Sequence, residues 1–184
     1  MNDKELKKEA LKLEWERVND FLEEIDLSRL PKGFLSCAHN TYYALFHAIC
    51  ALNIEYGLPA PSTHRGLLNT LYTNFVRTGI LTDEDNKACV KAEDIRGKCD
   101  YDGKYKPSIE QLLNNFNNVK KVIDKIKILC QEHEQTEANS HTNNRLSVHR
   151  AELIAKSEAA FQKSVNQALS GKHQEKDHSV KPHH

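Results

Sequence analysis

The stretch FLSCAHNTYYALFHAICALNIEYG, residues 34–57, decides the fold of this chain. Its larger apolar residues recur at alternating steps of three and four, which places them on one side of a helix. They are Leu35, Ala38, Tyr42, Leu45, Ile49, Leu52 and Tyr56. A row of small residues lies beside them, at positions 37, 41, 44, 48 and 51, and small side chains let a second helix approach closely. We therefore predict a central helix that other helices cover on two sides.

A third row of the same helix carries His39, Tyr43, His47 and Cys50. His47 has two interpretations: a general base, because an ordinary histidine titrates near neutral pH, or a core histidine bonded to a neighbouring tyrosine. The set His39, His47 and Cys50 does not have the spacing of a metal site, and a buried cysteine commonly acts as a small apolar residue. We predict no metal and no cofactor.

The composition narrows the class of protein. The 184 residues include 26 basic and 26 acidic side chains, so no overall charge directs the chain to nucleic acid or to an anionic membrane. Five cysteines form no CxxC pair, which fits a reduced, cytoplasmic setting. No apolar run has the length that a membrane span needs, so we expect no membrane partner.

Glycine and proline are few and fall between periodic segments, which predicts an all-α fold. Residues 1–131 are expected to form the helical body. Residues 132–145 are polar without apolar periodicity and are predicted to be a linker. An additional helix is predicted over residues 146–170 and a disordered tail over residues 171–184.

Polar residues that could take part in catalysis or ligand binding lie at the ends of two predicted helices. Arg96 and Asp100 are four apart and can meet on one helix face, which would fix the guanidinium for a phosphate; the simpler interpretation is an ordinary intrahelical ion pair. Lys98 adds positive charge nearby, and Tyr101 could stack on a base. His64 follows the predicted N-cap Thr63, where it can either help to bind an anion or serve as a polar residue at a helix start.

Three ordered segments resemble the HEPN domain family: YYALFHAICALN (42–53), STHRGLLNTLYTNFVRTG (62–79) and IRGKCDYD (95–102). The resemblance spans about residues 5–130 and is strongest to the prokaryotic branch found with toxin–antitoxin and minimal nucleotidyltransferase pairs. It implies an up-and-down bundle of four to five helices and a homodimer. Beyond this bundle we expect the C-terminal helix and the tail.

The resemblance also implies a function. Many members of the family are metal-independent endoribonucleases that carry an arginine and a histidine in the pattern R-x(4-6)-H. Arg96 matches the arginine, but the histidine positions hold Tyr101, Asp102 and Gly103. Three alternatives stay open: Tyr101 acts as an acid or a positioning group, His47 or His64 replaces the missing histidine, or the domain binds RNA or nucleotides without cutting.

We therefore take Arg96, Asp100 and Tyr101 as candidate catalytic residues. The candidate ligand-binding residues are His64, Lys98, Tyr105 and His47. The leading prediction is a component of a toxin–antitoxin or defence-type system that binds RNA or a nucleotide phosphate. The alternative is a non-catalytic module that docks a separate nucleotidyltransferase antitoxin. In some relatives such a partner adds AMP to a tyrosine near this motif; Tyr101 and Tyr105 flank the corresponding position.

Overall fold

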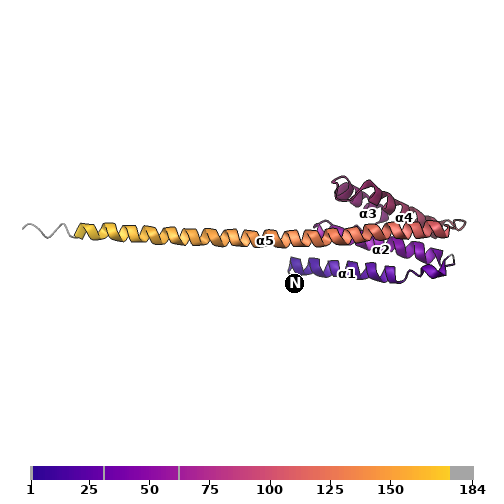
Figure 1. Ribbon diagram of the computed structural model, residues 1–184, viewed down its shortest axis with the longest axis horizontal. Helices are drawn as coiled ribbons and strands as arrows, with labels where there is room; N and C mark the ends of the chain where they lie inside the picture. The colour runs from indigo at the N-terminus through magenta and orange to yellow at the C-terminus, as the bar shows by residue number, and fades with distance from the viewer. Residues whose placement is uncertain (1, 31, 62, 175–184) are drawn as a thin grey trace, which may run out of the picture. The chain divides into compact units, whose positions relative to one another are not determined.

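The computed structural model describes residues 2–30, 32–61 and 63–174, and the chain divides into two compact units, residues 1–135 and 136–184. The helices are α1 (Asp3–Glu23), α2 (Phe34–Glu55), α3 (His64–Leu71), α4 (Asp83–Tyr101) and α5 (Ile109–Gln174), as Figure 1 shows. A short 3₁₀ helix (Leu27–Arg29) follows α1, and a π-helical segment (Tyr72–Val76) continues α3. The described residues contain no strand, which confirms the predicted all-α fold.

Side-chain caps set the starts of the two helices that carry the candidate site. The Thr63 hydroxyl accepts the Gly66 N–H at 3.0 Å and begins α3. Thr82 and Asp85 form a reciprocal pair at the start of α4: the Thr82 hydroxyl accepts the Asp85 N–H, and the Asp85 carboxylate accepts the Thr82 N–H. These contacts satisfy N–H groups that have no partner inside the helix, and α3 begins directly after the predicted N-cap Thr63.

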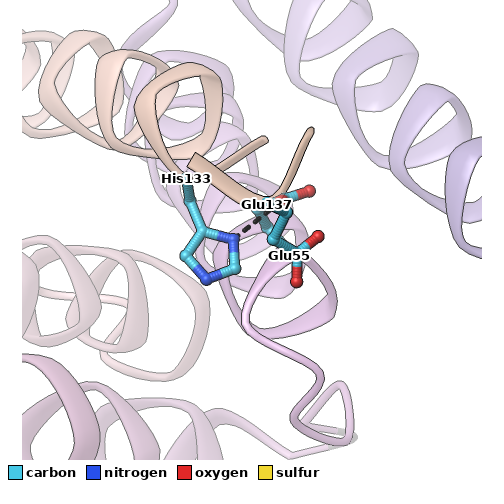
Figure 2. Close-up of side chains that lie close together, drawn as sticks. All are labelled: Glu55, His133 and Glu137. Carbon is cyan, nitrogen blue, oxygen red and sulfur yellow. Dashed lines mark hydrogen bonds and ion pairs between the residues drawn. The ribbon is translucent and has the colours of Figure 1, made fainter. Parts of the chain in front are cut away.

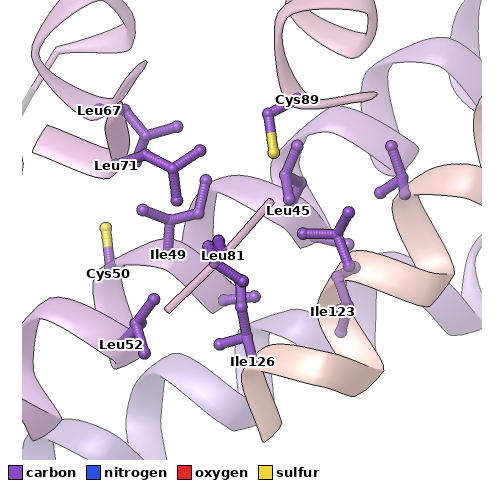
Figure 3. Close-up of a cluster of buried hydrophobic side chains, with 14 of the residues drawn as sticks. Leu45, Ile49, Cys50, Leu52, Leu67, Leu71, Leu81, Cys89, Ile123 and Ile126 are labelled. Carbon is purple, nitrogen blue, oxygen red and sulfur yellow. The ribbon is translucent and has the colours of Figure 1, made fainter. Parts of the chain in front are cut away.

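The core of the first unit is built on α2, which packs against α1, α3 and α4. Figure 3 shows α2 side chains meeting side chains of α3 and of the first part of α5. The fully buried large residues of α2 are Tyr42, Leu45, Ile49 and Leu52. The predicted central helix is therefore confirmed, except that Leu35, in its first turn, is 49% exposed and takes no part in the core.

A polar contact links the C-terminal end of α2 to α1 and α5 within the first unit. The buried Glu55 carboxylate accepts a hydrogen bond from Lys7 Nζ at 3.2 Å and lies 3.0 Å from His133 Nδ1 (Figure 2). The His133 ring also stacks on Tyr56, with 4.2 Å between ring centroids. A buried carboxylate needs such partners, because desolvation of an unpaired charge is strongly unfavourable.

Residues 132–145, predicted as a linker between two parts of the chain, are helical and belong to α5, and the boundary between the two compact units falls within them, after residue 135. The segment contains no glycine or proline, so no residue in it breaks the helix. The predicted helix 146–170 lies within α5. Residues 171–174, predicted as tail, also belong to α5, and residues 175–184 lie outside the described chain. None of the described helices, α5 included, is apolar enough over a sufficient length to cross a membrane.

Candidate functional site

The guanidinium of Arg96 is the centre of the most unusual polar arrangement in the first unit. Arg96 lies near the end of α4 and is only 3% exposed. Its Cζ atom is 4.8 Å from the ring centroid of Tyr42 and 5.8 Å from that of Tyr43, both on α2. Two aromatic rings at these distances stabilise the cation through their π electrons. Tyr42 and Tyr43 of α2 therefore form the aromatic surface against which the Arg96 guanidinium packs.

Most of the hydrogen-bonding capacity of Arg96 is unused. Nη1 lies 3.4 Å from the Asp100 carboxylate, which is long for an ion pair. Nε and Nη2 are buried and have no hydrogen-bond partner within the described part of the chain. These two nitrogens form the side-on edge of the guanidinium, whose parallel N–H groups match two oxygens of a carboxylate or phosphate. Proteins rarely leave buried donors unpaired, so the edge is suited to receive an anion.

His64, at the start of α3, reaches the same region through Tyr42. The Tyr42 hydroxyl and His64 Nδ1 are 2.8 Å apart. Burial raises the pKa of Tyr42 to about 12, even though the Arg96 guanidinium acts in the opposite direction. Burial first, and then the positive charge of Arg96, lower the pKa of His64 below its ordinary value of 6.5. Tyr42 is therefore a neutral phenol and His64 a neutral imidazole at pH 7, with one ring nitrogen free to accept a proton.

Aromatic rings surround this arrangement. The His39 and Tyr43 rings are 4.4 Å apart, and Phe46 contacts His64 edge-on with 5.8 Å between centroids. Tyr43 also meets His64 edge-on at 5.9 Å. The rings exclude water from one side of the Arg96 guanidinium, which strengthens any charge–charge interaction formed there.

In the structure, His47 contacts α1 and not Arg96 of α4. Its Nδ1 lies 2.7 Å from the Glu14 carboxylate on α1, and its ring stacks on Phe21 of the same helix with 5.6 Å between centroids. His47 thus joins α2 to α1 and makes no described contact with Arg96. Tyr43, one turn earlier on α2, lies between the two: its ring stacks on Phe21 with 5.5 Å between centroids and lies 5.8 Å from Cζ of Arg96.

The remaining predicted residues lie around the exposed end of α4. Tyr101 is 84% exposed. Lys98 donates to Asp94 at 2.9 Å, and this pairing raises its pKa. The ammonium of Lys98 lies 5.8 Å from the ring centroid of Tyr105. The structure therefore brings together Arg96, Asp100 and His64, and leaves Tyr101 at the surface.

Sequence reasoning missed the role of Tyr42 and Tyr43. It placed Tyr42 in the apolar stripe of α2, which is correct for its burial, but gave no sign that its hydroxyl joins His64. The signal that could have found the pair is the occurrence of two adjacent tyrosines near the middle of a largely buried helix. Two tyrosines side by side cover two helix faces, so at least one must meet the polar end of another element.

The first unit has one further arrangement with metal-binding side chains. Glu55 and His133 offer a carboxylate oxygen and an imidazole nitrogen, which are ordinary metal ligands (Figure 2). Glu137, also drawn there, belongs to the second unit. The same Glu55 oxygen accepts Lys7, whose ammonium opposes a cation at that position. The polar groups around Glu55 are thus satisfied by one another.

A model of the HEPN domain matches residues 12–129, which is most of the first unit and more than half of the chain. A search of curated proteins found no match. HEPN domains are linked in general to RNA binding and RNase-like functions, and they often dimerise.

Proposed function

Because the chain belongs to the HEPN domain family, we propose that it binds RNA or a nucleotide through a phosphate held by Arg96. The observation that carries this proposal is the buried, unpaired Nε and Nη2 edge of the guanidinium. An arginine placed only to brace a helix end would be expected to pair these donors with protein oxygens. A phosphate group supplies the missing acceptors in matching geometry.

The phosphate enters from the side of Asp100. This carboxylate is exposed at the surface, and its 3.4 Å separation from Nη1 makes it a weak competitor. Movement of Asp100 toward solvent frees Nη1, next to the Nε and Nη2 edge, while the two tyrosine rings keep Arg96 in place. Asp100 is thus a positioning residue that holds the empty site.

Cleavage of RNA at this site uses His64 as the base. With the His64 proton on Nδ1, the Tyr42 oxygen accepts that N–H and Nε2 keeps a lone pair. Nε2 takes the proton of the ribose 2′-hydroxyl, the 2′-oxygen attacks phosphorus, and the bond to the 5′-oxygen breaks. The leaving oxygen takes a proton from solvent, and the product is a 2′,3′-cyclic phosphate. Arg96 stabilises the negative charge that develops on the phosphoryl oxygens.

The experiment is incubation of the full chain with mixed-sequence RNA in the presence of EDTA. We expect wild type to cut the RNA, Arg96→Met and His64→Gln to lose at least about a hundredfold in rate, and Tyr101→Phe to keep its rate. His47→Gln is the matched control, because this histidine lies on the same bundle but contacts α1. Equal cleavage by wild type and Arg96→Met would contradict the enzymatic proposal.

A second candidate is a non-catalytic module that docks a separate nucleotidyltransferase antitoxin. It is supported by the 84% exposure of Tyr101, which lies where the ribonucleases of the family carry their histidine. An exposed phenol at a helix end is accessible to a modifying enzyme. Co-expression with a nucleotidyltransferase encoded beside this chain should then add the mass of one AMP, and Tyr101→Phe should abolish the addition. An unchanged mass in the wild type would contradict this candidate.

For both candidate functions, we propose that the protein acts as a cytoplasmic homodimer within a toxin–antitoxin or defence-type system. Light scattering on the purified chain tests the dimer directly. A mass of one chain at micromolar concentration would contradict it, and a mass of two chains is the expected result.

A further inference from the structure

His39 is a histidine of α2 that the proposed cleavage does not use. It is partly exposed, and its ring packs on Tyr43 with 4.4 Å between centroids. The same Tyr43 ring lies 5.8 Å from Cζ of Arg96 and 5.9 Å from the ring centroid of His64. One tyrosine is therefore the common neighbour of the guanidinium and of two histidines.

The packing of α2 against α4 determines on which side of the guanidinium His39 lies. Tyr42 of α2 contacts Arg96 of α4. One turn earlier on α2, Ala38 belongs to the same buried cluster as Cys99, which follows Arg96 on α4. The two helices are therefore antiparallel here, and His39, which is next to Ala38, lies toward the C-terminal end of α4.

His64 lies toward the other end of α2. Besides Tyr43, it contacts the ring of Phe46, one turn later on the helix, with 5.8 Å between centroids. His39 is one turn earlier than Tyr43 and lies toward Asp100, the side from which the phosphate enters in the proposed function. A phosphate held by the guanidinium therefore has one histidine toward each side.

The ring nitrogens of His39 are available for proton transfer. Among the residues that the structure describes, they take part in no hydrogen bond or ion pair. The histidines on either side of it in the fold differ: Nδ1 of His64 is bonded to Tyr42, and Nδ1 of His47 to Glu14. A partly exposed imidazole with both nitrogens free can take a proton from solvent and deliver it to a bound ligand.

Cleavage of RNA needs an acid as well as a base. When the bond between phosphorus and the 5′-oxygen breaks, the leaving oxygen develops negative charge. Solvent can supply its proton, but a positioned side chain accelerates such a step by about 10²–10⁴-fold. His64 cannot supply it in the same step, because its Nε2 is then taking up the proton of the 2′-hydroxyl.

We propose that His39 is the acid of this cleavage, a role that rests on the proposed function at Arg96. His39 begins the reaction as the imidazolium and His64 as the neutral imidazole. As the bond from the 2′-oxygen to phosphorus forms, the 2′-proton passes to Nε2 of His64. As the bond from phosphorus to the 5′-oxygen breaks, His39 gives a proton to that oxygen. The products are a 2′,3′-cyclic phosphate and a 5′-hydroxyl, and exchange with solvent returns both histidines to their starting forms.

The test compares two leaving groups in the presence of EDTA. The substrates are DNA strands with a single ribonucleotide, one strand for each base, so that only one 2′-hydroxyl can attack. In a second set a bridging 5′-sulfur replaces the 5′-oxygen at the scissile bond. A thiolate leaves without a proton, because a thiol is far more acidic than an alcohol.

His39→Gln should lose at least about a hundredfold in rate on the oxygen substrate and cut the sulfur substrate at nearly the wild-type rate. Arg96→Met should lose on both substrates, because it removes the stabilisation of the phosphoryl oxygens. His39→Phe keeps an aromatic ring for Tyr43 but has no proton to give, so it should behave as His39→Gln does. His47→Gln is the matched control on the same helix and should keep the wild-type rate on both substrates.

Three results would overturn the role of His39. The first is a wild-type rate of His39→Gln on the oxygen substrate, and the second is an equal loss on both substrates. The third is recovery of the rate in His39→Phe, which would show that the ring only packs. If the wild type cuts neither substrate, the proposed function fails as well. If Arg96→Met abolishes cleavage and His39→Gln retains it, only the acid is refuted.

Discussion

Replacement of Arg96 by methionine separates a binding role from a structural one. Methionine keeps an unbranched apolar stem but is shorter than arginine, and it removes the charge and all five N–H groups. In the folded chain the guanidinium is 3% exposed, and two of its nitrogens lack partners within the described residues. The wild-type protein therefore contains a buried charge that its own fold does not fully satisfy.

The expected change in the free energy of unfolding follows from the contacts that the Arg96 guanidinium makes and lacks. Each unpaired buried donor costs about 1–3 kcal/mol, so loss of both should return about 2–6 kcal/mol. The substitution also removes the contacts with Tyr42 and Tyr43, at about 0.5–2 kcal/mol, and the long pairing with Asp100, at about 0–1 kcal/mol. These contributions leave a net change between a destabilisation of about 1 kcal/mol and a stabilisation of about 5 kcal/mol, centred on a stabilisation of about 2 kcal/mol, which is in line with apolar replacements of other buried ions.

Thermal and urea unfolding measure this change. A gain of 1 kcal/mol corresponds to a rise in Tm of about 2–4 °C for a chain of this size. Leu45→Ala serves as the control for an ordinary loss of packing. If Arg96→Met instead destabilises the protein by more than about 2 kcal/mol, the guanidinium is a structural brace, and the argument from unpaired donors is refuted.

Other parts of the fold give further predictions. Leu45→Ala, which removes a fully buried side chain of α2, should lower the free energy of unfolding by about 2–5 kcal/mol in urea titrations. Because the pKa of His64 is lower in the fold than the ordinary 6.5, the folded state binds fewer protons, and wild type should lose stability as pH falls from about 7 toward the folded pKa. His64→Gln should lack that component; an identical pH dependence in both proteins would contradict it. Burial raises the pKa of Cys50, Cys89 and Cys130 to about 12, so a thiol reagent should label them only at the rate of unfolding, and rapid labelling of native protein would show an open core.

Much of the fold could be predicted because its determinants are local. The three-four spacing of Leu45, Ile49 and Leu52 fixes the buried face of α2, and hydroxyl caps at Thr63 and Thr82 fix two helix starts. The intrahelical pair of Arg96 with Asp100 also follows from a spacing of four.

Other features of the structure depend on packing that local patterns do not contain. Residues 132–140 are mostly exposed within α5, and without an apolar face the periodicity of a sequence does not distinguish a helix from a loop. The proximity of Tyr42, His64 and Arg96 depends on how α2, α3 and α4 pack together. Neither spacing nor composition could choose between His47 and His64, because their neighbours lie on different helices.

The central claim is that the unpaired edge of Arg96 holds a phosphate. Its most direct measurement is the ³¹P and amide-proton NMR titration of the full chain with single-stranded RNA, observing the side-chain Nε–H signal of Arg96. The account predicts that RNA shifts this signal strongly, as a new hydrogen bond forms to a charged oxygen, and that the Arg96→Met variant binds RNA at least about tenfold more weakly while remaining folded. An Nε–H signal that stays unchanged at saturating RNA, together with equal affinity of the variant, would contradict the account.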